Sequence, residues 1–121
     1  MSATVLLYNF SAAKAAALQT LCAQQGIRAL EVPAVDQGKP IAALLGLPVP
    51  DKDGPGVVPG ELLVLSGFTA SDLDRFLDAF PTASIPPIPF KAMVTPTNLA
   101  WTGAELYLEL GKERRAMGLA P

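Results

Sequence analysis

The chain has 121 residues, a length typical of one domain, with a formal net charge of −2 and no histidine. Hydrophobic residues make up 50% and charged residues 17% of the chain, which argues against disorder over its whole length. The absence of histidine and the presence of a single cysteine, Cys22, exclude histidine-dependent catalytic triads, the usual zinc sites and an internal disulfide.

The charge pattern and the hydropathy also limit the partners. No basic stripe is available to neutralise phosphates, so we expect no nucleic-acid partner. No apolar run reaches the roughly 20 residues that a membrane-spanning helix needs, and no secretory signal pattern opens the chain. We therefore expect a cytoplasmic protein with no membrane contact, no metal and no cofactor.

The first part of the chain predicts a strand, a helix and a second strand. Thr4–Tyr8 is an apolar run rich in strand formers, as in a strand buried on both faces. Ser11 fits the N-cap of a helix that ends near Gln25, and Gly26 fits its terminator. Residues 27–32 then read as the second strand.

The middle of the chain is less regular. Residues 36–45 predict a short helix with Pro40 in its first turn. Residues 46–60 contain four glycines and four prolines, which indicates a mobile surface loop. Residues 61–66 are predicted to form the third strand.

The next segment predicts a third helix and a fourth strand. Thr69 precedes Asp72 by three residues, as in a capping box. Apolar residues follow at helical spacing, namely Leu73, Phe76, Leu77 and Phe80. Residues 90–95 predict the fourth strand, and the prolines before it favour a place at the edge of the sheet.

The last helix is predicted to begin at Thr102, which forms a second capping-box pattern with Glu105, and to run to about Met117. Its expected inward residues are Leu106, Leu110 and Met117. No internal repeat is visible beyond the alternation of strands and helices.

This alternation predicts one α/β domain over residues 1–121, with helices packed on a four-stranded, mostly parallel sheet in the order 2-1-3-4. A ferredoxin-like α+β arrangement is the alternative.

Four short motifs carry a family resemblance. They are Leu-Leu-Tyr-Asn-Phe (6–10), Leu-Leu-Gly-Leu-Pro (44–48), Val-Leu-Ser-Gly-Phe (64–68) and Lys-Ala-Met-Val-Thr-Pro-Thr-Asn-Leu-Ala-Trp (91–101). Together they resemble a family of small bacterial and archaeal proteins known only as a domain of unknown function, over about Thr4 to Met117. The resemblance implies one compact domain and supplies no activity, cofactor or catalytic residue.

Three predicted turns suggest a ligand site. Ligands of open α/β sheets bind beyond the carboxyl ends of the strands, and helix N-termini attract anions. If the first, third and fourth strands run the same way, their ends meet at one edge. The candidate ligand residues there are Asn9, Ser66, Gly67, Thr97 and Asn98, and the alternative is that these residues only make turns and caps.

Several other residues each have two possible structural roles. Lys91 either faces the ligand or points to solvent from an edge strand, where a lysine discourages edge-to-edge pairing. Phe10 and Phe68 occupy matching places after the first and third strands, so they form either a shared exposed patch or plugs of the core. Trp101 is either an exposed anchor for a partner or a packed residue at the start of the last helix. Cys22 is expected to be a small buried hydrophobe.

The sequence therefore favours a non-enzymatic interaction or regulatory module, with an unknown protein partner or a second copy of itself. The alternative is a binder of a small anionic ligand or nucleotide. An enzyme ranks last, because no nucleophile–base pair is evident.

Overall fold

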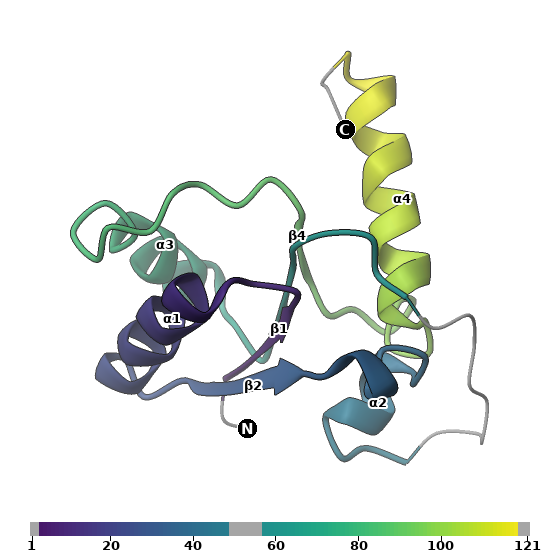
Figure 1. Ribbon diagram of the computed structural model, residues 1–121, viewed down its shortest axis with the longest axis horizontal. Coiled ribbons are helices and arrows are strands. Elements are labelled where there is room, and N and C mark those ends of the chain that lie inside the picture. Colours follow the sequence, from purple (N-terminus) through teal and green to yellow (C-terminus); the bar gives the residue numbers. More distant parts are fainter. Residues whose placement is uncertain (1–2, 49–56, 119–121) are drawn as a thin grey trace.

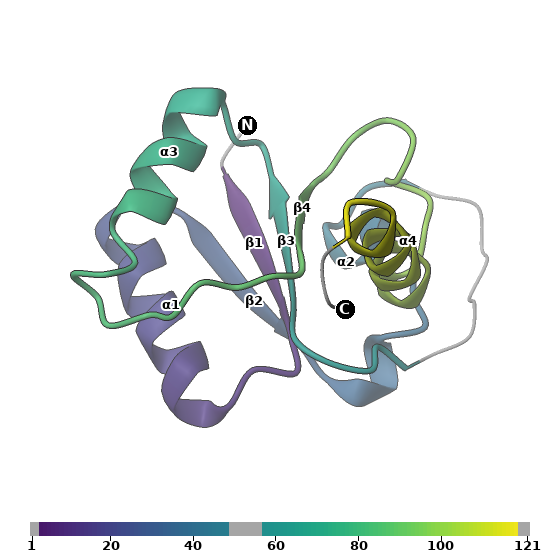
Figure 2. The same ribbon diagram turned by 90° about the horizontal axis from the view of Figure 1, so that it is seen from above.

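A computed structural model describes residues 3–48 and 57–118, which form three layers (Figure 2). The strands are β1 (Thr4–Tyr8), β2 (Arg28–Val32), β3 (Leu62–Ser66) and β4 (Lys91–Met93), and the helices are α1 (Ala12–Gln24), α2 (Ile41–Leu44), α3 (Ala70–Asp78) and α4 (Gly103–Ala116), with a 3₁₀ turn at Ala34–Asp36. The sheet has the order β2-β1-β3-β4, with α1 and α3 on one face and α2 and α4 on the other. The α/β class and the strand order are confirmed. The ferredoxin-like alternative is wrong, because helices alternate with strands throughout.

The directions of the strands differ from the expectation in one respect. β1 is parallel to β2 and β3 is parallel to β4, but the central pair β1 and β3 is antiparallel. The sheet is thus mostly parallel, yet the expectation that the first, third and fourth strands share one direction is wrong. Tyr8 lies opposite Leu62, so the chain returns to the end of the sheet where β1 finishes and starts β3 there.

This antiparallel centre relates two similar halves of the chain. The first half runs β1-α1-β2-α2 and the second runs β3-α3-β4-α4. Leu6 lies opposite Val64 at the middle of both central strands, so the register is that of two strands around a local two-fold axis. The structure therefore shows a repeated β-α-β-α unit that the sequence did not reveal.

The turns after the two central strands also match. Asn9 and Gly67 both adopt left-handed backbone, with φ of 66° and 76°. A phenylalanine follows each, and then a helix cap: Ser11 accepts from the Lys14 N–H, and Thr69 accepts from the Asp72 N–H. The Thr69 N–H in return donates to the Asp72 carboxylate, which lowers the pKa of that carboxyl.

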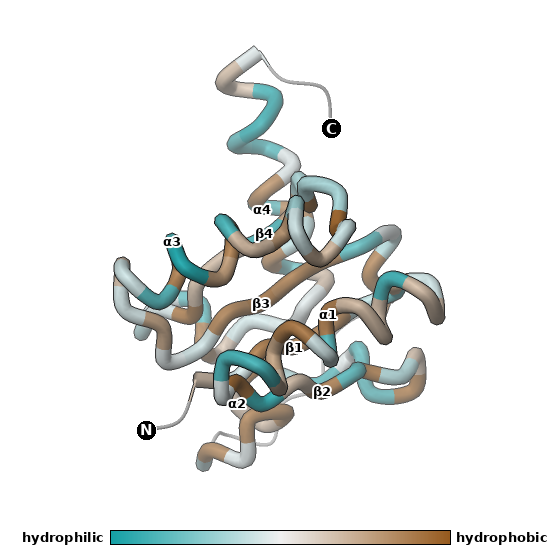
Figure 3. The backbone as a smooth tube through the Cα atoms, turned by 90° about the vertical axis from the view of Figure 1, so that its left-hand side faces the viewer, coloured by the Kyte–Doolittle hydropathy of each residue, from teal (hydrophilic) through white to brown (hydrophobic). Residues whose placement is uncertain are grey.

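Side-chain alternation divides the core between the two faces of the sheet. Val5 and Leu7 of β1 belong to the cluster under α1 and α3, while Leu6 and Tyr8 belong to the cluster under α2 and α4. Burial on both faces explains why β1 and β3 are nearly unbroken apolar runs, and Figure 3 shows the hydrophobic colour along β3.

Some predicted boundaries need correction. The helix expected over 36–45 is divided, because Pro40 is extended and forms a β-bridge with Thr102, and α2 starts only after it. Met117 is 73% exposed and not inward, since the last turns of α4 extend beyond the sheet (Figure 1). Of the expected loop at 46–60, residues 49–56 lie outside the described residues.

Candidate functional site

The candidate ligand residues divide between two opposite edges of the sheet. β1 and β2 end at one edge, and β3 and β4 end at the other, because the central pair is antiparallel. Ser66, at the end of β3, lies opposite Thr4, at the start of β1. Asn9 is therefore separated from Ser66 and Gly67 by the length of β1, and the expected meeting of the three turns at one edge does not occur.

At the β1/β2 edge, the Asn9 side chain holds the chain that enters β3. Its amide N–H groups donate to the carbonyls of Val58 (2.7 Å) and Gly60 (3.0 Å). Its oxygen accepts from Gln37 (2.8 Å), and the Gln37 oxygen accepts from the Val58 N–H (3.0 Å). Both amides are thus occupied within the fold, which is the behaviour of a structural network.

At the end of the sheet where β3 and β4 finish, the Asn98 side chain closes the turn after β4. Its oxygen accepts from the Thr95 N–H (2.9 Å) and its N–H donates to the Met93 carbonyl (3.1 Å). Thr97 is exposed beside it, and Ser66 is partly buried at the end of β3. The hydrogen bonds of Asn98 agree with the turn-making alternative.

Four of the sequence candidates nevertheless line one hollow. This hollow, the β4 groove, has a volume of about 330 Å³ and lies between β4 and α4; its lining includes Lys91, Thr97, Asn98 and Trp101 together with Glu109 and Glu113. The Lys91 ammonium donates to the Ile88 carbonyl at 2.9 Å. Lys91 is thus partly buried, bonded to the backbone and part of the lining of the β4 groove.

The two phenylalanines do not form a shared patch. Phe68 is 8% exposed and packs edge-on against Phe76, with ring centroids 5.6 Å apart, so it plugs the core. Phe10 is partly buried at the opposite edge, where the Lys14 ammonium lies 6.0 Å from its ring centroid. Trp101 is partly buried against the α2/α4 cluster, and its carbonyl accepts from the Ile41 N–H.

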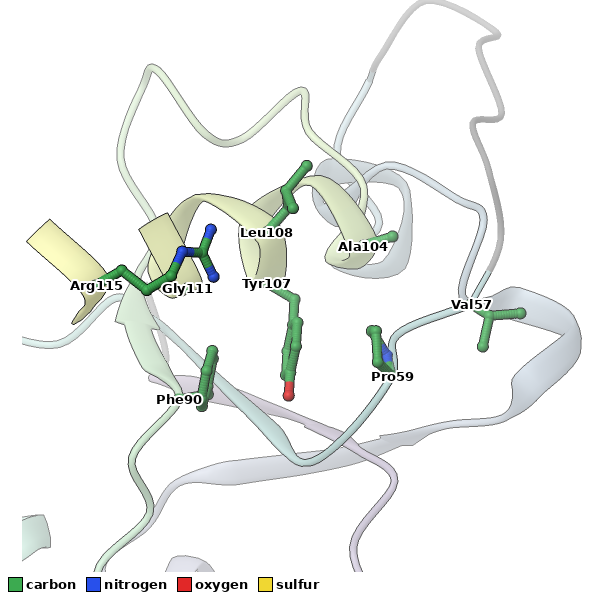
Figure 4. A pocket seen from close by; sticks show the side chains of 8 residues that line it. All are labelled: Val57, Pro59, Phe90, Ala104, Tyr107, Leu108, Gly111 and Arg115. Atoms are coloured by element: carbon green, nitrogen blue, oxygen red, sulfur yellow. The ribbon is translucent and has the colours of Figure 1, made fainter. Parts of the chain in front are cut away.

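A second hollow lies on the other side of α4, and the sequence did not indicate it. This α4 groove has a volume of about 290 Å³ (Figure 4) and is lined by Ala104, Tyr107, Leu108, Gly111 and Arg115 of α4 and by Val57, Pro59 and Phe90. The missed signal was Leu108, an apolar residue outside the set expected to face inward, which is 57% exposed.

The floor of the α4 groove is well packed. The rings of Phe90 and Tyr107 stack with centroids 4.3 Å apart and an angle of 12° between their planes. The Arg114 guanidinium lies 5.5 Å from the Phe90 ring centroid. These contacts fix the floor, while Leu108 and Val57, which is 74% exposed, stand at the sides.

The titratable groups of the described residues offer little chemistry. The Cys22 side chain is fully buried, and this burial raises the pKa of its thiol to about 11. Burial likewise raises the pKa of Tyr8, whose hydroxyl has no hydrogen-bond partner. Within 3–48 and 57–118, no group of three or more cysteine, aspartate or glutamate residues is placed to hold a metal ion. In the same part of the chain, no helix has the length and apolar character needed to cross a membrane.

Comparison with known protein families gives a match to the second half of the chain. Residues 61–117 match the family model described as a domain of unknown function, DUF3783. The match supports the resemblance to a domain-of-unknown-function family, and it coincides with the second β-α-β-α unit, from β3 to α4. No curated protein and no solved structure matches the chain.

Proposed function

We propose that this chain, whose second structural unit matches a domain of unknown function, is a protein-interaction module that uses the α4 groove as its docking surface. The observation that carries the proposal is an apolar hollow with a fixed aromatic floor and two exposed aliphatic side chains at its sides, Leu108 and Val57. Apolar surface of this kind often marks the site where another protein binds.

The polar residues that could have supported chemistry are engaged elsewhere. The amides of Asn9 and Asn98 bond to backbone groups, and the Lys91 ammonium bonds to a carbonyl. The Cys22 thiol is buried and its raised pKa keeps it protonated at neutral pH, so it is a poor nucleophile. These observations favour a binding role over catalysis.

Burial of the exposed aliphatic groups would stabilise a complex at the α4 groove. Removing a leucine side chain fully from water is worth about 1.5–3 kcal/mol. Leu108 is already about half covered, so burying the rest of its side chain on docking would stabilise the complex by roughly half of that free energy. The Phe90–Tyr107 stack adds a preformed floor, which reduces the cost of ordering side chains on binding.

A photo-crosslinking amino acid tests the proposal in cells. It is placed at Val57, beside the groove, and in a matched variant at Val35, which is 88% exposed and is not among the groove residues. We expect a discrete higher-mass adduct from position 57 and none from position 35. The absence of any adduct from position 57, or the same adducts from both positions, would contradict docking at the α4 groove.

The alternative, a small anionic ligand or nucleotide, has one supporting observation, the presence of Lys91, Thr97 and Asn98 in the β4 groove. Glu109 and Glu113 line the same groove and would repel an anion. A thermal-shift screen with nucleotides and inorganic phosphate tests it: we expect no stabilisation, and a saturable rise in melting temperature that Lys91→Ala abolishes would favour the alternative.

A further inference from the structure

Four of the five α4 residues that line the α4 groove follow a regular pattern of size, and the fifth, Tyr107, forms the floor with Phe90. Ala104, Leu108, Gly111 and Arg115 are separated by four, three and four residues, which places them on one stripe of the helix. Their sizes alternate along the stripe as small, large, small and large. We propose that the occupant of the α4 groove is a second copy of this chain, whose α4 packs antiparallel to the first about a two-fold axis.

The stripe is complementary to itself when one helix is reversed. The spacing reads four, three, four in both directions, so a second copy can be laid against the first with Leu108 facing Gly111 and Ala104 facing Arg115. Each large side chain then meets a small one, at four places in the pair. A two-fold axis requires this kind of self-complementarity, in which residue i contacts residue j and residue j contacts residue i.

The charges of α4 favour the same orientation. Residues 103–109 carry Glu105 and Glu109 and no cation, a net charge of −2. Residues 110–116 carry three cations and one carboxylate, a net charge of +2: Lys112, Arg114, Arg115 and Glu113. Antiparallel packing sets the acidic half of each helix against the basic half of the other, whereas parallel packing would set like charges together. The helix dipoles also favour antiparallel neighbours.

Arg115 has a place in both the single chain and the pair. In the single chain its guanidinium lies over Gly111, where an added Cβ would be 3.4 Å from Nη1. The residue is exposed, so its side chain can rotate away and let Leu108 of the second copy approach Gly111. In the antiparallel register, Glu105 of the second copy lies one residue from the position facing Arg115, within reach of a long side chain.

Pairing through the β4 edge of the sheet is less suited to a dimer. β4 has only three residues, and the Asn98 side chain already donates to the Met93 carbonyl. A very short edge strand with one of its carbonyls already bonded offers few groups for the addition of another strand. The α4 groove is therefore the better place for a second copy.

The mass of the purified protein in solution is the first test of this inference, which rests on the proposed function. Size exclusion with light scattering is run on the full chain from about 1 μM to 1 mM. We expect the mass to rise from 12.6 kDa towards twice that value as the concentration increases. Leu108→Glu should raise the dissociation constant at least about 30-fold, whereas Val35→Glu, also at an exposed site, should leave it unchanged. A wild-type chain that stays at 12.6 kDa throughout would overturn the proposal, as would a dimer that survives Leu108→Glu.

A cysteine pairing experiment tests the register. The Leu108→Cys and Gly111→Cys variants are oxidised in three samples: each variant alone, and the two variants mixed before oxidation. Cys22 is retained because its thiol is buried. We expect the mixture to form a crosslinked dimer faster than either variant alone. Mixing Leu108→Cys with Val35→Cys serves as the control and should give no such gain. Equal rates in all samples would refute the facing of Leu108 and Gly111.

The two proposals fail in distinguishable ways. If the protein is monomeric but position 57 crosslinks to a different protein in cells, the docking surface stands and the second copy is wrong. If position 57 gives no adduct in cells and the protein is monomeric, both proposals are wrong. An adduct of twice the chain mass, together with a concentration-dependent dimer, supports both.

Discussion

The contact between Tyr8 and the start of α4 gives a sharp prediction for Gly103→Ala. An added Cβ at Gly103 would lie 2.6 Å from Cε2, 2.8 Å from Cζ and 3.0 Å from the hydroxyl oxygen of Tyr8. The Tyr8 ring has no exposed surface, and it packs within the cluster beneath α2 and α4. The ring therefore cannot move into solvent, and a shift must displace other members of the cluster.

Two opposing effects set the magnitude. Overpacking of a close-packed core costs about 1–3 kcal/mol. Replacing glycine by alanine inside a helix gains up to about 1 kcal/mol, and less at the first helical position. We expect a net loss of about 1–2 kcal/mol of unfolding free energy, which corresponds to a fall of about 4–8 °C in melting temperature for a chain of this size.

Gly111→Ala in the same helix is the matched control. Its added Cβ would lie 3.4 Å from the flexible end of Arg115 and 3.9 Å from Phe90, so the gain in helix propensity should dominate. Urea unfolding followed by circular dichroism, at low protein concentration to limit self-association, should show Gly103→Ala less stable and Gly111→Ala at least as stable as the wild type. A Gly103→Ala protein of wild-type stability would refute the reasoning about the Tyr8 ring, as would an unchanged cost of Gly103→Ala in a Tyr8→Leu background, where the clash is removed.

Two further predictions concern Asn9 and Cys22. Asn9→Ala should lower the free energy of unfolding in urea by about 2–4 kcal/mol, because it removes the bonds to Val58 and Gly60 and leaves alanine in left-handed backbone. Asn9→Gly removes the same bonds without the backbone strain, so it should cost about 1 kcal/mol less. Equal costs would mean that the positive φ makes no contribution. Burial raises the pKa of the Cys22 thiol to about 11, so the folded state favours the protonated thiol. The contribution of this group to stability is therefore complete below the usual thiol pKa of about 8.5, and it is lost as the pH rises through 11. The unfolding free energy should therefore fall between those pH values by more in the wild type than in Cys22→Ala, and equal falls would contradict the burial effect.

Local signals predicted most of the elements. The capping boxes at Thr69 and Thr102 and the cap at Ser11 are present in the structure, because such bonds join residues only three apart in the chain. The apolar run of β1 predicted a strand buried on both faces, residues 61–66 were predicted as the third strand, and the order of the strands was predicted as well. The prolines before β4 correctly indicated an edge strand.

The candidate site was predicted less well, for one reason. A strand buried on both faces has the same apolar pattern whichever way it runs, so residues 61–66 do not state whether β3 is parallel or antiparallel to β1. The direction depends on where the segment between β2 and β3 brings the chain back, and Asn9 and Gln37 fix that point through bonds to Val58. Asn9 was predicted as a ligand residue, with turn-making as the alternative, and its bonds in the structure are those of a structural residue.

The amino-acid sequence alone determined most of the segments that become helices and strands, most of their buried faces, and which chemistries are excluded by the lack of histidine. These properties depend on neighbours in the chain and on composition. Only the tertiary structure decided the reversal of β3, the separation of Asn9 from Ser66, and the hollow beside Leu108. The first two depend on strand pairing and on bonds such as those from Asn9 to Val58, and the third depends on Val57, Phe90 and Gly111; in each case residues far apart in the chain meet only when it folds.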